Sequence, residues 1–152
     1  MALPNIFTKE VSEEFIKRIN SLTSSTNAKW GKMNVAQMLA HCCVTYEYVY
    51  ENKHKKPSAF IKFILKLMVK NTVVNEAPYK PGGRTGPDFL VTDERNFEVE
   101  KQRLIGYLKK TQELGENHFD GKESHSFGAL TKSEWNNMFQ KHLDHHLKQF
   151  GV

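Results

Sequence analysis

The chain of 152 residues has the length of one ordinary domain, and 39% of its residues are hydrophobic and 26% charged, which is typical of a globular protein. Its apolar runs are only a few residues long, which excludes a membrane-spanning helix of roughly 20 residues. The net charge of +5 is too modest to predict nucleic-acid binding. The opening MALPNIFTKEV predicts no secretory signal, and the adjacent Cys42 and Cys43, which cannot close a loop, predict a reducing, cytoplasmic compartment.

Two helices are predicted in the first third of the chain. In residues 9–21 the spacing of Phe15 and Ile19 gives one apolar face opposite a charged one. The second helix is predicted to open at Asn34, because Gln37 three residues later completes a capping box. Its apolar stripe consists of Val35, Met38, Leu39, Cys42, Tyr46 and Val49.

A short, basic, amphipathic helix is predicted at residues 58–70. Its apolar residues cover a wide face, and Lys62, Lys66 and Lys70 follow one another at i, i+4 and i+8. We interpret this lysine stripe as the solvated face of the helix. The sequence APYKPGGRTGPD at 77–88 then predicts a long irregular connection.

The third main helix is expected to start near Thr92 or Asp93 and to end at Leu114, with Gly115 as its C-terminal stop. Residues 116–129 are expected to form a loop.

The last helix is predicted to run from Thr131 to about Gln149, with Glu134 completing its capping box. No segment shows a convincing strand pattern. These elements predict an all-α fold, a four-helix bundle with an additional short helix between the second and third main helices, in a single domain over residues 1–152.

Three of the seven histidines lie within five consecutive positions near the C-terminus. His142 and His146 fall one turn apart in the middle of the apolar face, where leucine would pack without polar nitrogens to satisfy. Such a pair can bind one metal ion, and His41, beside the apolar stripe of the second helix, is the leading candidate for a third ligand. Three protein ligands leave a coordination position open, which is typical of a catalytic site.

Other interpretations of these residues stay open. The histidines could form a buried, hydrogen-bonded network without a metal. His145 could lie beside the site or replace a ligand, and His125 could reach the site from a loop. The sequence contains no HExxH and no Glu-x-x-His motif, which disfavours a zincin-type protease and a ferritin-like di-iron centre.

Two stretches of the chain resemble a known superfamily. Trp30 with NVAQMLAHC (34–42), and FGALTKSEW (127–135) running on to HLDHHLKQFGV (142–152), resemble the DinB/YfiT-like superfamily of four-helix-bundle metal-binding proteins. Within it, the whole chain looks like a branch of unknown function, domain of unknown function 1569. The resemblance implies a metal site made by one histidine of the second helix and an HxxxH pair of the last. By motif these are His41, His142 and His146.

The better-understood relatives are similar to metal-dependent thiol S-transferases that use bacillithiol or mycothiol. The resemblance therefore implies a metal-dependent transferase or hydrolase whose substrate is a small molecule, such as a low-molecular-weight thiol. We expect a divalent metal ion, zinc or nickel first and iron as a further candidate, and Tyr46 is a candidate for orienting the substrate. The alternative is a non-catalytic helical-bundle protein for binding or dimerisation, a homodimer with a buried histidine network.

Overall fold

The computed structural model describes residues 2–152 and confirms that the chain is mostly helical. Its four longest helices are α1 (Lys9–Ser21), α2 (Val35–Tyr50), α5 (Phe97–Leu114) and α7 (Lys132–Gln149). The connections hold α3 (Ala59–Met68), α4 (Lys70–Val74), the 3-10 turn η1 (Pro87–Phe89), α6 (Glu116–Phe119), β1 (Glu123–Ser124) and β2 (Gly128–Ala129). Within the described chain, none of these helices combines the length and apolar character that crossing a lipid bilayer requires.

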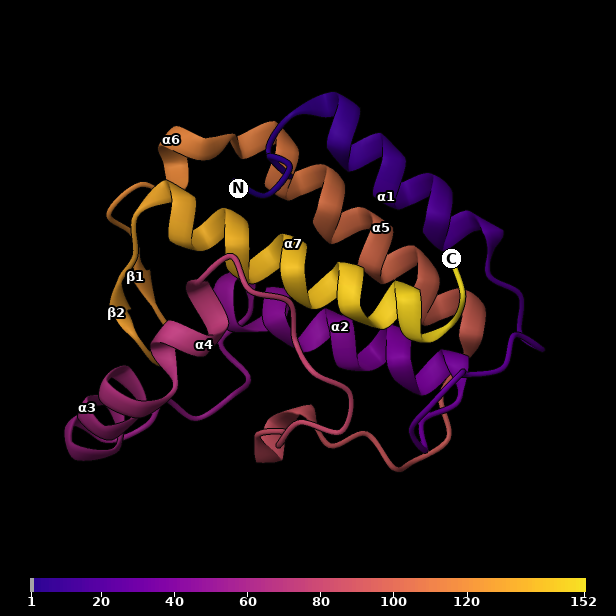
Figure 1. Ribbon diagram of the computed structural model, residues 1–152, viewed down its shortest axis with the longest axis horizontal. Helices are drawn as coiled ribbons and strands as arrows, with labels where there is room; N and C mark the ends of the chain where they lie inside the picture. The colour runs from indigo at the N-terminus through magenta and orange to yellow at the C-terminus, as the bar shows by residue number, and fades with distance from the viewer. Residues whose placement is uncertain (1) are drawn as a thin grey trace.

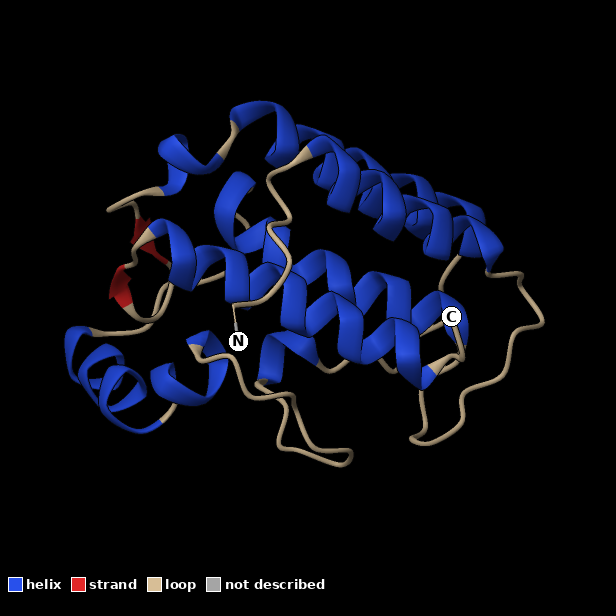
Figure 2. Cartoon of the chain, turned by 45° about the horizontal axis from the view of Figure 1, so that its top comes forward, coloured by secondary structure: helices blue, strands red, loops and turns tan. Residues whose placement is uncertain are grey.

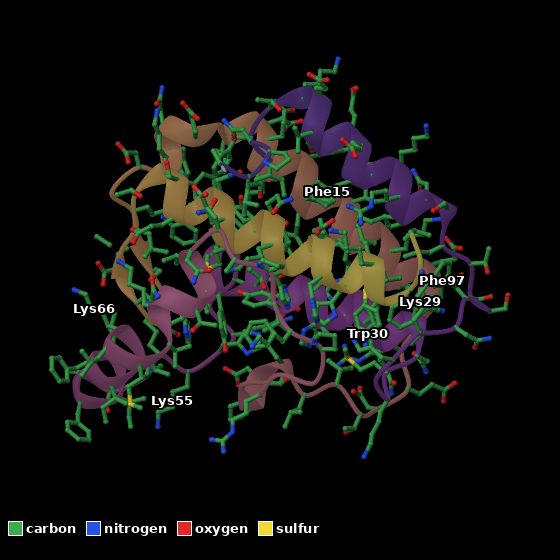
Figure 3. All side chains as sticks on the ribbon, viewed as in Figure 1. Phe15, Lys29, Trp30, Lys55, Lys66 and Phe97 are labelled. Carbon is green, nitrogen blue, oxygen red and sulfur yellow. The ribbon has the colours of Figure 1, made fainter. Side chains whose placement is uncertain are left out.

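The four longest helices share one apolar core. Helix α5 packs against both α1 and α2, and α7 contacts the same two helices (Figure 1). Figure 2 shows the long helices lying roughly along one direction, with the two short strands at one end. Phe15 lies on the side of α1 that faces this core (Figure 3). The largest fully buried side chains include Trp135, Tyr46, Phe119, Phe139, Met38, Leu104 and Leu143.

Local capping sets the helix starts. The Asn34–Gln37 and Thr131–Glu134 capping boxes both form, as predicted, and they open α2 and α7. The predicted start of the third main helix near Thr92 or Asp93 is wrong, because α5 begins only after Asn96, whose side chain accepts a hydrogen bond from the Val99 amide. This cap satisfies a free amide of the first turn and leaves residues 92–95 outside the helix.

Residues 116–129, expected to be a loop without strands, contain α6 and a small antiparallel pair of strands. Glu123 pairs with Ala129 and Ser124 with Gly128. The Ser124 hydroxyl donates to the Gly128 carbonyl and accepts from the Phe127 amide. Strands of two residues are too short to show the alternation from which a strand is predicted.

Helix α3 is turned opposite to the expected orientation. Lys62 forms an ion pair with Glu123, and Lys70, just beyond the helix, forms one with Glu134 of α7. Five large apolar side chains of α3 instead lie exposed: Phe60, Ile61, Phe63, Leu67 and Met68. The interpretation of the lysine stripe as the solvated face is therefore wrong for two of its three members, because the glutamates of the neighbouring elements attract these lysines toward the body of the protein.

Two cations tie the helices together. Arg103 of α5 donates to Glu47 of α2 at 2.5 Å and to Glu100 of its own helix at 2.6 Å, and both glutamates are buried. Lys141 of α7 is also buried, and its Nζ donates to the carbonyls of Thr72 and Asn75 at 2.7 and 2.9 Å. The same Nζ donates to the side-chain oxygen of Asn75 at 2.8 Å. These bonds join α2 to α5 and the C-terminal end of α4 to α7.

Candidate metal centre

Three imidazole rings from two helices meet inside the protein. His41 comes from the middle of α2, and His142 and His146 lie one turn apart on α7. One ring nitrogen from each lies within 4.8 Å of the other two. The ring centroid of His41 lies 4.9 Å from that of His142 and 4.4 Å from that of His146. His41 and His146 are buried and His142 is partly exposed, so the predicted convergence of these three rings is confirmed.

Each of the three rings has an oxygen partner at its Nδ1. The Nδ1 of His41 lies 2.8 Å from the Phe89 carbonyl oxygen. The Nδ1 of His142 lies 3.0 Å from the Thr45 hydroxyl. The Nδ1 of His146 lies 2.7 Å from the Gln149 side-chain oxygen. These contacts leave each Nε2 as the nitrogen available to a shared ligand, and the Nε2 atoms of His41 and His142 are only 3.0 Å apart.

The partners decide which nitrogen carries the proton on two of the rings. A backbone carbonyl can only accept, so His41 donates from Nδ1 to Phe89. The amide of Gln149 donates to the Trp30 carbonyl at 2.8 Å, which leaves its oxygen to accept from the Nδ1 of His146. In both neutral rings the Nε2 therefore presents a lone pair to the centre. This is the form in which histidine ligates a metal, with the other ring nitrogen held by a hydrogen bond.

Helix spacing brings two of these three partners to the site. Thr45 lies four residues after His41 on α2, and Gln149 lies three residues after His146 on α7, so each occupies the same helix face as a histidine of the site. Gln149 lies on the same face of α7 as His142 and His146, and the helical spacing of the sequence already indicates this position. The Phe89 carbonyl carried none, because the residue lies in η1 within an irregular connection.

The ring of Phe89 covers one side of the centre. It lies edge-on to His41 and to His142, with centroids 5.4 and 5.7 Å apart. The connection that follows α4 therefore supplies both a hydrogen-bond acceptor and an apolar cover. The sequence predicts neither of these two contributions. Excluding water on this side strengthens electrostatic interactions at the centre.

The other candidate residues lie outside the three-histidine group. His145 packs edge-on to Trp30 at 5.9 Å and to Tyr79 at 5.8 Å, although its ring is 5.0 Å from that of His146. His125 stacks on Tyr48 with centroids 3.8 Å apart.

Tyr46 lies in the core rather than beside the three rings. Its ring stacks with those of Phe139 and Tyr107, at 5.0 and 5.6 Å, and its buried hydroxyl has no hydrogen-bond partner among the described residues. The expected role of Tyr46 in orienting a substrate gains no support from this position.

Burial keeps the three histidines neutral. Loss of hydration lowers the pKa of His146 to about 3, and the nearby ring of His41 contributes in the same direction. Burial also holds the pKa of His142 well below its usual value, and it lowers the pKa of His41 despite the opposing hydrogen bond to Phe89. Neutral imidazole is the form that binds metal, so burial leaves the three rings in a protonation state that could hold a metal ion.

We expect the metal-free protein to lose stability as the pH falls from 6.5 to 5. In this range the unfolded chain protonates His146, at a pKa of about 6.5, whereas the folded chain does not until about 3. The unfolded state binds more protons, so the free energy of unfolding should fall by roughly 1–2 kcal/mol from this residue. Urea denaturation of chelator-treated protein at several pH values measures the change. In a His146→Gln variant the free energy of unfolding should depend less steeply on pH. An identical pH dependence in both proteins would contradict the prediction.

The helical fold and the buried histidine group define a mostly helical protein with a site that could hold a divalent metal ion. The chain belongs to the family described as "Protein of unknown function (DUF1569)", whose model matches residues 7–151. No curated protein and no solved structure matches the chain.

Proposed function

We propose that this chain is a metal-dependent enzyme in which His41, His142 and His146 hold one divalent ion. The observation that carries the proposal is the shared arrangement of the rings, each with Nδ1 beside an oxygen and Nε2 left for a common ligand. Imidazole nitrogens suit zinc and nickel, which we expect first, and also iron. A buried set of neutral nitrogens without a carboxylate does not suit magnesium or calcium, which prefer oxygen ligands.

The proposed chemistry is activation of a small molecule. A divalent ion with three protein ligands retains an open position, where as a Lewis acid it lowers the pKa of a water or thiol. Hydrogen bonds from the three rings to Phe89, Thr45 and Gln149 orient them, and the Phe89 ring shields one side of the site from water. The partial exposure of His142 leaves a side open to solvent. Because the chain resembles thiol S-transferases, we propose that the reaction is transfer of a low-molecular-weight thiol, or a hydrolysis.

The proposal includes the fold family and its setting. We propose that α1, α2, α5 and α7 form a DinB-like four-helix bundle, and that residues 1–152 make up a single domain. Their shared core supports both statements. The free thiols of Cys42 and Cys43 are buried, which supports a reducing, cytoplasmic setting.

A second candidate function uses the same three rings without a metal. The 3.0 Å separation between the Nε2 atoms of His41 and His142 is a hydrogen-bonding distance if His142 carries its proton on Nε2 and accepts from Thr45. The rings would then be a buried polar network in a non-catalytic binding protein. Thermal unfolding separates the two functions, because an ion that binds the folded chain raises the melting temperature and a metal-free network is indifferent to a chelator.

Replacing the oxygen partner of one ring should weaken metal binding. Gln149→Leu keeps the approximate volume of a buried side chain but removes the acceptor for His146. We expect the affinity for zinc or nickel to fall about 10–100-fold, as is typical when an outer hydrogen bond to a ligating histidine is lost. Calorimetric titration of the metal-free protein measures the change. Gln149→Glu loses the donor to the Trp30 carbonyl, as the leucine variant does, but keeps an acceptor for His146, so it should bind the ion more tightly than Gln149→Leu. Equal affinities for the leucine and glutamate variants would contradict the proposed role.

A further inference from the structure

Helix α3 presents an uncovered apolar face to solvent. Phe60, Phe63, Leu67 and Met68 are 64–74% exposed, and Ile61 is 46% exposed. At about 100° per residue these five side chains span roughly 160° of the helix circumference, the width of the face that an amphipathic helix normally buries. We call these five residues the α3 face. It has the pattern of a packing surface, and the described chain does not cover it.

The charges of this helix lie on its other side. Lys62 is held by Glu123, and Lys70 by Glu134. No charged residue of α3 interrupts the α3 face. A face without charge can meet an identical face without electrostatic repulsion, whereas a lysine-bearing face could not.

The position of α3 leaves the face free for a partner. The helix packs on α4 and protrudes from the end of the molecule where the two strands lie (Figure 1). It therefore contributes no apolar side chain to the core shared by the long helices. Burial of its apolar surface requires another molecule.

The size of the α3 face is sufficient for a specific interface. Two phenylalanines and three aliphatic side chains at these exposures present on the order of 600 Å² of apolar surface, given roughly 150–250 Å² for a buried aromatic side chain. This matches the largest apolar patch of a typical monomer, about 300–600 Å², which is often functional. Two such faces together would bury about 1,200 Å², the lower limit for a stable, specific complex.

We propose that the α3 face binds the α3 face of a second copy of this chain. In a two-fold dimer the same patch occurs on both sides of the interface, and an uncharged, apolar patch is self-complementary. An anionic lipid surface is the competing occupant, because Lys55 and Lys66 lie exposed at the same end of the molecule (Figure 3). The ion pairs of Lys62 and Lys70 favour the second copy, since they direct these two cations away from the α3 face rather than to its rim.

The oligomeric state tests this proposal directly. At a chain concentration of about 100 μM, well above a micromolar Kd for an interface of this size, sedimentation equilibrium of the wild type should give twice the monomer mass of 17.6 kDa. Leu67→Glu places a charge in the centre of the α3 face and should give the monomer mass. Val99→Glu is the matched control, since Val99 is also an exposed apolar helix residue, 53% exposed, but lies on α5. This variant should remain a dimer.

Three results would overturn the proposal: a monomeric wild type at this concentration, a dimeric Leu67→Glu variant, or dissociation by Val99→Glu as well. Co-sedimentation with vesicles of phosphatidylcholine and phosphatidylserine tests the competing occupant, an anionic lipid surface. Binding of a monomeric wild type to these vesicles, lost in Leu67→Glu, would assign the face to lipid instead. Circular dichroism of each variant checks the fold, and unchanged metal binding in Leu67→Glu shows that the metal centre is independent of this surface.

Discussion

Replacing both His142 and His146 by alanine should abolish metal binding. The wild-type chain, incubated with zinc or nickel and then desalted, is expected to carry about one ion per chain. The double variant retains only His41, and one imidazole cannot hold a divalent ion against the solvent. Elemental analysis of the two proteins measures the difference. His125→Ala is the control, since His125 stacks on Tyr48 away from the three rings, and it should keep the full metal content.

Thermal unfolding provides a second measurement on the same proteins. An ion present at about 1,000 times its Kd stabilises the folded chain by about 4 kcal/mol, which for a protein of this size raises the Tm by on the order of 10 °C. The chelator should reverse this rise in the wild type and leave the double variant unchanged. Transfer of a small thiol to an alkyl halide should require the ion. In this reaction the thiol loses its proton to solvent, a carbon–sulfur bond forms, and the carbon–halogen bond breaks to release halide. Negligible metal in the wild type together with a Tm insensitive to the chelator would refute the metal site.

Arg103→Met should strongly destabilise the fold. Arg103 binds two buried carboxylates, of Glu47 and Glu100, at 2.5 and 2.6 Å. Removing one partner of a buried ion pair costs about 3–5 kcal/mol, because it leaves uncompensated charge. Since Lys53 and His54 also bind Glu47, we expect a loss of about 3 kcal/mol and a Tm lower by roughly 6–12 °C.

Urea denaturation at neutral and acidic pH measures this loss and tests its cause. Burial alone would raise the pKa of Glu47, but hydrogen bonds from Lys53, His54 and Arg103 lower it below the ordinary value. The stabilisation from this carboxylate is therefore present above the unfolded pKa of about 4.3 and disappears as the pH falls through the folded pKa. The difference in the free energy of unfolding between wild type and variant should therefore become smaller at acidic pH. Lys9→Met, which removes a cation from the exposed Lys9–Glu13 pair, should leave the free energy of unfolding unchanged.

Local sequence rules were sufficient for the helices that carry the metal centre. The capping boxes at Asn34 and Thr131 depend on residues three positions apart, and both were predictable from the chain alone. The spacing of His142 and His146 placed both rings on one face of α7, where polar nitrogens had no other explanation. The convergence of His41 with this pair was predicted from its position at the edge of an apolar stripe and, independently, from the resemblance.

Features that depend on distant partners were not predictable in this way. The amphipathic pattern of α3 separates two faces but does not say which one faces the protein, because Glu123 and Glu134 lie more than fifty residues further along the chain. The start of α5 was ambiguous because residues 92–96 contain three polar residues able to cap a helix. The acceptor for His41 is a backbone carbonyl of an irregular segment, and every residue has such a group. Sequence patterns therefore identified the three histidines better than the groups that orient them.

The ammonium group of Lys141 holds α4 against the helix that carries two of the three histidines. Lys141 directly precedes His142, and its three oxygen partners lie at the C-terminal end of α4. Moving α4 away from α7 would leave a buried charge without partners, which costs several kcal/mol. Helix α4 is therefore held in place against α7 at the residue that precedes His142. Any opening of the chain toward the three histidines is therefore expected to leave α4 in place.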